Sequence, residues 1–217
     1  MNDQELLKKL TESFPDFVRQ DYPWPEPFCE KPDNVRAIVL GTDPSYKLKR
    51  GIEFNKLQYV FELDRYKEGP SNPYFDSILE NLKLLGLDLS SVFVENVCRN
   101  YFTKVTYEND IWKEAAEIWI PRLKDDLDKR FSDKNIPVLM TTEIIYHVLL
   151  KDTGHIRTSR DLYKIESAVP IPPEKNKLER NLIPVYRHYE HKLKRHTEFK
   201  ERIKKLLQAG MKDLENN

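Results

Sequence analysis

Hydrophobic positions along the chain follow two patterns, one typical of buried strands and one of amphipathic helices. Short runs of β-branched and aliphatic residues predict four strands, which span residues 35–40, 92–96, 136–140 and 182–186. Apolar residues at helical spacing predict helices over residues 3–14, 73–85, 110–130, 143–150 and 192–209. We expect Asn72 to cap the second helix and Pro121 to kink or break the third.

The alternation of strands and helices predicts the fold class. This order favours a parallel sheet covered by helices on both faces, so we expect an α/β protein, a three-layer α/β/α sandwich around a mostly parallel, four-stranded sheet. The chain has 217 residues and suits a single domain over residues 1–217, since single cores stop growing at about 250–300 residues. Residues 21–34 form a lead-in that is too proline-rich for a helix or a central strand.

Composition and charge narrow the function classes. Lysine and arginine number 36, as do aspartate and glutamate, and this balance excludes bulk attraction to a polyanion as the main driver of partner choice. The chain has no apolar stretch of the roughly 20 residues that a membrane span needs, and its acidic start does not resemble a signal peptide. Cys29 and Cys98 are too few for a zinc or iron–sulfur site. One disulfide is possible, but two buried free thiols in a reducing cytoplasm are favoured.

Polar residues follow three of the predicted strands. Ligands of open parallel sheets bind beyond the carboxyl ends of the strands, so we expect Asp43, Asn96 and His188 to meet at one edge. Pro44 fixes the direction in which Asp43 leaves its strand, and Gly41 lets another group approach the backbone closely. Dinucleotide-binding, phosphate-loop and α/β-hydrolase motifs are absent from the sequence, and the histidines form only a weak zinc pattern. We therefore expect no cofactor and no metal.

These segments together resemble the motifs of the uracil-DNA glycosylase superfamily. Residues 41–46 are similar to the family's Gly-Gln-Asp-Pro-Tyr-His motif, and residues 51–54 to its Gly-x-x-Phe segment. Asn96 matches the asparagine that ends the family's next strand, and His188 matches the histidine of its last motif. The resemblance covers about residues 20–205 in order.

The resemblance implies a metal-free, monofunctional DNA glycosylase that hydrolyses the N-glycosidic bond of uracil or a related damaged base. In such an enzyme Asp43 would stabilise the oxocarbenium-like sugar and orient a water, and His188 would donate a hydrogen bond to the departing base. Phe54 would stack on the flipped base and Asn96 would pair with its edge. The implied base-binding residues are Thr42, Ser45, Tyr46, Phe54 and Asn96.

Basic residues near the same edge predict a surface for the phosphates of DNA, single- or double-stranded. They are Lys47, Lys49, Arg50, Arg187, Lys192 and Lys194. The helix over residues 110–130 is rich in acids and is expected to face away from nucleic acid. We expect a monomer.

The sequence also departs from the family motifs. Thr42 stands in place of the usual glutamine and Ser45 in place of a tyrosine, while Tyr189 and Glu190 replace a proline and a serine. Glu190 would repel a phosphate. Two alternatives therefore stay open: a catalytically weak or inactive module that binds nucleic acid or a nucleobase, and an unrelated small-molecule enzyme on the same scaffold.

Each candidate residue also has an ordinary structural interpretation. The segment around Asp43 could be turn chemistry and Phe54 could belong to the core. Asn96 could cap a turn, and His188 could be a surface residue in a basic segment.

Overall fold

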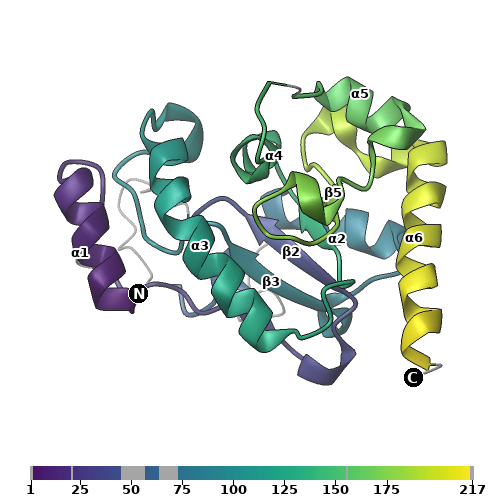
Figure 1. The fold of residues 1–217 in the computed structure, drawn as a ribbon, viewed down its shortest axis with the longest axis horizontal. Coiled ribbons are helices and arrows are strands. Elements are labelled where there is room, and N and C mark those ends of the chain that lie inside the picture. The colour runs from purple at the N-terminus through teal and green to yellow at the C-terminus, as the bar shows by residue number, and fades with distance from the viewer. Residues whose placement is uncertain (1, 21, 45–56, 64–72, 155, 216–217) are drawn as a thin grey trace.

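A computed structural model describes residues 2–20, 22–44, 57–63, 73–154 and 156–215. It has the expected mixed α/β class, with a mostly parallel sheet (Figure 1). The strands are β1 (Phe28–Cys29), β2 (Ala37–Gly41), β3 (Val92–Asn96), β4 (Val138–Met140) and β5 (Leu182–Pro184). The helices are α1 (Asp3–Ser13), α2 (Pro73–Leu84), α3 (Trp112–Arg130), α4 (Glu143–Leu149), α5 (Ser159–Lys164) and α6 (Thr197–Glu215).

The strand order β1-β3-β2-β4-β5 places β2 at the centre of the sheet. β2 pairs in parallel with both β3 and β4, and β4 pairs in parallel with β5. The chain leaves β2 for β3 on one side and then crosses to β4 on the other. In Figure 1, α3 passes in front of the strands and α2 lies behind them, as right-handed crossovers in opposite directions require.

The sheet has five strands rather than the expected four. The additional strand is β1, which pairs antiparallel with β3 at the edge, where Phe28 faces Val94 and Cys29 faces Phe93. β1 has two residues and lies inside the proline-rich lead-in, so it is too short to give a hydrophobic pattern. Prolines are compatible with an edge strand because one side of it needs no hydrogen-bonded partner.

Two helix predictions also need correction. Residues 192–196 are not part of the last helix, because a short 3₁₀ turn (η8, Leu193–Arg195) precedes α6. That turn is held to the preceding one by Arg195 Nη1, which donates to the carbonyl of Tyr189 at 3.0 Å. α3 is one continuous helix through Pro121, so this proline does not cause the break that was one of the two outcomes predicted for it. Asn72, the predicted cap of α2, lies outside the described residues.

The four parallel strands are buried over their whole length, as expected for a sheet covered on both faces. Cys29 and Cys98 are free thiols, of which Cys98 is buried and Cys29 half-buried. Among the helices in the described ranges, none has both the length and the hydrophobicity of a membrane crossing.

Candidate active site

The carboxyl ends of β2 and β3 lie side by side, because Gly41 and Asn96 are partners in the parallel register. β2 is also the strand from which the chain winds outward in both directions. In open α/β sheets such a reversal leaves a crevice beyond the strand ends, where ligands bind. The segments that follow β2 and β3 are therefore the natural place for a site.

Asp43 lies just beyond β2 and is 8% exposed. Its Oδ1 accepts a hydrogen bond of 2.5 Å from the hydroxyl of Thr106. The Oγ1 atoms of Thr106 and Thr42 lie 3.2 Å apart. Thr106 belongs to a short 3₁₀ turn before α3 (η4, Thr106–Glu108), so the loop that leaves β3 holds the carboxylate that follows β2.

The environment of Asp43 changes its acidity. Burial raises the pKa of this carboxyl from its ordinary value of 3.8 to about 6. Hydrogen bonding from Thr106 and Thr42, the nearby indole of Trp112 and the positive charge of Arg187 oppose this rise in the pKa. Asp43 is thus ionised at neutral pH yet can take up a proton in mildly acidic solution.

Asn96 is 3% exposed and ends β3. Its backbone N–H donates to Oε1 of Glu95 at 2.8 Å, and its side-chain Oδ1 lies against the α-carbon of Gly41. A Cβ at position 41 would overlap both this oxygen and the ring of Phe61. The expected close approach at Gly41 is therefore present, and Asn96 and Phe61 make it.

Phe61 is an aromatic residue at this edge that the sequence did not identify. It lies in the 3₁₀ turn η2 (Val60–Glu62) and has the left-handed backbone angle φ of 60°, which is unfavourable for a bulky residue. Its ring stacks on that of Phe75, with centroids 6.1 Å apart and planes at 29°. Strained backbone angles of this kind concentrate at functional sites, and here the strain accompanies the placement of a ring beside the Asn96 amide.

Two residues that follow β5 differ in their surroundings. β5 lies two strands from β2, which corresponds to about 10 Å. Arg187 is half-buried, its charge lowers the pKa of Asp43, and its carbonyl accepts from Ser77 at 3.3 Å. His188 has a 58% exposed side chain, with Nδ1 3.8 Å from Oε2 of Glu190. Of the two, Arg187 is the one whose charge reaches Asp43.

The remaining predicted site residues fall into two groups. Lys194 pairs with Glu80 at 3.0 Å on the surface, and Lys192 is half-buried between the turns η7 (Tyr189–His191) and η8. The others lie outside the described residues: Ser45, Tyr46, Lys47, Lys49, Arg50 and Phe54.

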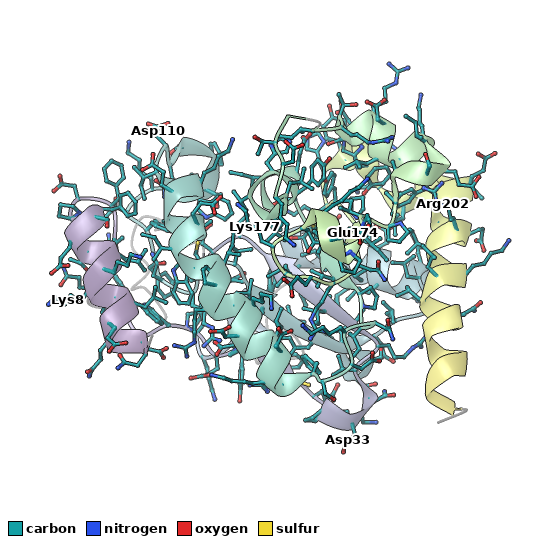
Figure 2. All side chains as sticks on the ribbon, viewed as in Figure 1. Lys8, Asp33, Asp110, Glu174, Lys177 and Arg202 are labelled. Atoms are coloured by element: carbon teal, nitrogen blue, oxygen red, sulfur yellow. The ribbon has the colours of Figure 1, made fainter. Side chains whose placement is uncertain are left out.

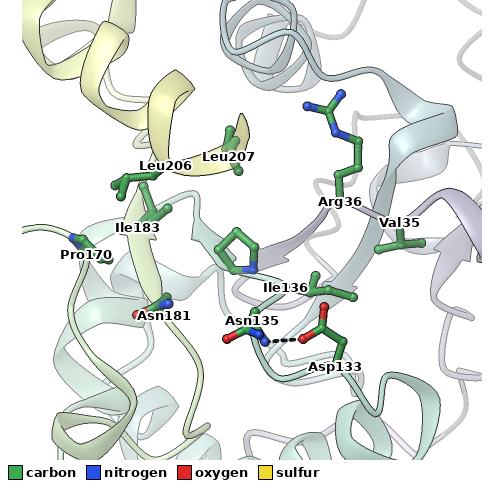
Figure 3. Close-up of a pocket in the computed structure, with 11 residues that line it drawn as sticks. Val35, Arg36, Asp133, Asn135, Ile136, Pro170, Asn181, Ile183, Leu206 and Leu207 are labelled. Carbon is green, nitrogen blue, oxygen red and sulfur yellow. Dashed lines mark hydrogen bonds between the residues drawn. The ribbon is translucent and has the colours of Figure 1, made fainter. Parts of the chain in front are cut away.

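Two cavities lined by described residues lie elsewhere. A cavity of about 90 Å³ is at the amino ends of the strands, between Val35, Ile136 and Leu207 of α6 (Figure 3). A polar cleft of about 400 Å³ lies between α3 and the β1–β3 edge, where Arg99 binds the buried Glu95. Within the described ranges, no three histidine, cysteine, aspartate or glutamate side chains are grouped closely enough to hold a metal ion.

Sequence reasoning missed the contribution of the segment before α3. Thr106 and Trp112 both act on Asp43, and between them Asn109 is 5% exposed with an amide that has no hydrogen-bond partner among the described residues. No local motif marks these residues, because they reach Asp43 only through the fold.

Comparison of the sequence with protein-family models found no match, and neither did comparison with curated proteins. The chemistry of the site therefore follows from its own residues. A buried carboxylate can stabilise a nearby positive charge or orient a water. The Asn96 amide offers a donor and an acceptor together, and the Phe61 ring offers a flat apolar surface beside them.

Proposed function

We propose that the protein is a metal-free, monofunctional DNA glycosylase, which hydrolyses the N-glycosidic bond of uracil or a related damaged base. The observation that supports this proposal is that Asn96 and the Phe61 ring lie beside Gly41 at the end of β2, two residues before the buried Asp43. These residues supply a carboxylate for the sugar, an amide for the base edge and a ring for the base face.

We further propose that the chain belongs to the uracil-DNA glycosylase superfamily and folds as a three-layer α/β/α sandwich. The order of its motifs along the sequence supports the relationship, as does the position of Asp43 just beyond β2, where the strand order reverses. The crossovers through α2 and α3, on opposite sides of the sheet, support the layered arrangement.

Asp43 would act on the sugar. Breaking the N-glycosidic bond develops an oxocarbenium-like sugar and a base that carries the negative charge. An ionised Asp43 beneath the sugar stabilises the first of these charges and accepts a proton from the attacking water. Burial strengthens this electrostatic effect, because the carboxylate acts in a medium of low dielectric constant.

Asn96 and Phe61 would bind the flipped base. Removing a base from the stack costs a few kcal/mol, and stacking on an aromatic ring returns about 1–3 kcal/mol. Phe61 takes this role in the proposal because its ring and Oδ1 of Asn96 both lie against the position that a Cβ of residue 41 would occupy. The amide can pair with the neighbouring carbonyl and N–H of a pyrimidine.

The departing base would be stabilised from the end of β5. His188 is the proposed hydrogen-bond donor to the base, and Arg187 is a second positive group, since its charge reaches Asp43. Comparison of His188→Ala with Arg187→Met in single-turnover assays separates the two roles. The larger loss of the excision rate identifies the group that faces the base.

The test is an excision assay on single- and double-stranded oligonucleotides that carry one uracil, with alkali to cut at abasic sites. We expect cleavage by the wild type and a loss of at least 100-fold in Asp43→Asn. Asp33→Asn is the matched control, because Asp33 is an exposed aspartate at the amino end of β2 (Figure 2). No cleavage of either substrate by the wild type would refute the proposal.

A binding module without efficient catalysis is the second candidate function, and the surroundings of His188 favour it. This imidazole is largely exposed and has Glu190 beside it, at a place where a phosphate would meet a negative charge. Binding of uracil-containing DNA without cleavage between pH 5 and 9 is the outcome that would favour this candidate.

A further inference from the structure

We propose that Thr106 is the positioning residue of the site: its hydroxyl, itself held by that of Thr42, fixes the orientation in which Asp43 presents its carboxylate. The inference rests on the proposed function for the step that Asp43 performs. The hydrogen bonds of Thr106 do not depend on the proposed function and can be tested without any substrate.

The hydrogen bonds have one consistent direction when Asp43 is ionised. A carboxylate only accepts, so the Thr106 hydroxyl donates its single proton to Oδ1 of Asp43 at 2.5 Å. Oγ1 of Thr106 is then left as an acceptor for Thr42, 3.2 Å away, whose hydroxyl must donate. The two hydroxyls thus form a chain that ends on the carboxylate.

This chain joins two parts of the molecule that are far apart in sequence. Thr42 and Asp43 follow β2, whereas Thr106 belongs to the turn η4 after β3. The segment before η4 is anchored independently, because Thr103 donates its backbone N–H to Phe17 and its hydroxyl to Asp16. Thr106 is therefore held from its own side, and it can restrain Asp43 rather than follow it.

The charged and titratable groups that face Asp43 come from other elements. Arg187 approaches from the end of β5, and Cys98 from the segment after β3, where the negative charge of Asp43 adds to burial in raising the pKa of the thiol. Trp112 approaches from the start of α3. Thr42 and Trp112 also lower the pKa of Asp43 by hydrogen bonding, but the Thr106 hydroxyl is the group that donates to Oδ1 at 2.5 Å, so its loss removes that hydrogen bond.

The experiment follows the carboxyl carbon of Asp43 by ¹³C NMR while the pH is varied, with Asp43→Asn used to assign the signal. A hydrogen bond to a charged group is worth about 1.5–3 kcal/mol, so we expect the pKa of Asp43 to rise by about one to two pH units in Thr106→Val. Thr106→Ser keeps the hydroxyl and should restore the wild-type titration.

Thr141→Val is the matched control. Thr141 is a buried threonine at the same edge of the sheet, and its hydroxyl donates to the carbonyl of Leu40 at 2.8 Å instead of to Asp43. The substitution removes one buried hydrogen bond and should leave the titration of Asp43 unchanged. Equal changes of the pKa in Thr106→Val and Thr141→Val would show a general loosening of the edge and overturn the proposal.

A second readout is kinetic. If Asp43 must be ionised for excision, kcat of the wild type rises through about pH 6, and in Thr106→Val this rise moves to higher pH with KM unchanged. An unchanged titration in both Thr106→Val and Thr106→Ala overturns the inference. If Thr106→Val does not fold, Thr106→Ala and Thr42→Val carry the same titration test. If the wild type excises no uracil but the pKa of Asp43 still shifts in Thr106→Val, the glycosylase proposal is refuted and the role of Thr106 stands.

Discussion

The side-chain amide of Asn96 lies against the α-carbon of Gly41, its partner in the register of β2 and β3. Because glycine has no Cβ, Oδ1 of Asn96 and the ring of Phe61 share the space that another residue would fill. This close approach brings together the amide and the ring that we propose to bind the base, two residues before Asp43, which we propose to act on the sugar.

The first prediction concerns this contact. Gly41→Ala places a methyl group on Oδ1 of Asn96 and on the Phe61 ring, so both must move. A displacement of about 1 Å can cost 10²-fold in rate, and we expect kcat/KM for uracil excision to fall by about 10- to 100-fold. Overpacking should also lower the free energy of unfolding by about 1–3 kcal/mol, measured by urea denaturation.

Gly154→Ala is the control for that prediction, because a Cβ at Gly154 would meet only the side chain of Asp152. This variant should keep both the activity and the stability of the wild type. Full activity in Gly41→Ala would mean that the positions of Asn96 and Phe61 do not matter for excision.

The second prediction concerns stability and pH. The pKa of Asp43 is raised by burial to about 6, so between about pH 4 and 6 the folded protein holds a proton that the unfolded chain has released. The stability linked to this proton is fully present below pH 3.8 and is lost as the pH rises through 6. Asp43→Asn does not ionise, so at pH 7–8 its free energy of unfolding should exceed that of the wild type by about 1–3 kcal/mol.

Thermal unfolding of both proteins between pH 4 and 8 checks this. The difference in melting temperature should be small near pH 4 and should grow to a constant value above pH 7. A variant that is less stable than the wild type at pH 8 would show that the ionised carboxylate contributes favourably to folding.

The third prediction tests the Phe61 ring as a stacking surface. Phe61→Leu keeps an apolar side chain of similar bulk but loses the flat face. We expect the variant to lose the stacking energy of about 1–3 kcal/mol. It should therefore bind uracil-containing DNA about 5- to 150-fold more weakly. Phe75→Leu is the matched control, since Phe75 is the buried ring beneath Phe61. It should lower stability more than binding, and equal binding by the wild type and Phe61→Leu would exclude the stacking role.

The fourth prediction concerns the end of α3. Arg180 is fully buried, and its guanidinium donates to the carbonyls of Asp133 and Phe131 and to Asp128. Arg180→Met removes these donors, including the one to the buried carbonyl of Phe131, while Asp128 keeps Lys124, and should lower the free energy of unfolding by about 3–5 kcal/mol. Lys134→Met removes an exposed partner of the same Asp128 and should cost less than about 1 kcal/mol. Similar losses in the two variants would contradict this account.

Part of the site could be predicted from the sequence, because strand ends are marked locally. A β-branched run that stops at Gly41 and another that stops at Asn96 give the strand ends directly, and parallel strands bring those ends to one edge. Asp43 and Asn96 were predicted to be neighbours on this ground. The same rule places His188 at that edge but gives no direction for its side chain, which is largely exposed.

The sequence by itself determined the class of the fold, the positions of the four parallel strands and the edge at which polar residues gather, because burial imposes a hydrophobic pattern on each strand. The tertiary structure alone decided which side chains act on Asp43 there. Thr106 comes from the connection between β3 and α3, Trp112 begins α3 and Arg187 follows β5, so their approach depends on how α2 and α3 cross the sheet and where β5 pairs. Contacts of this kind are made between distant segments and are set by packing, so no local pattern of residues records them.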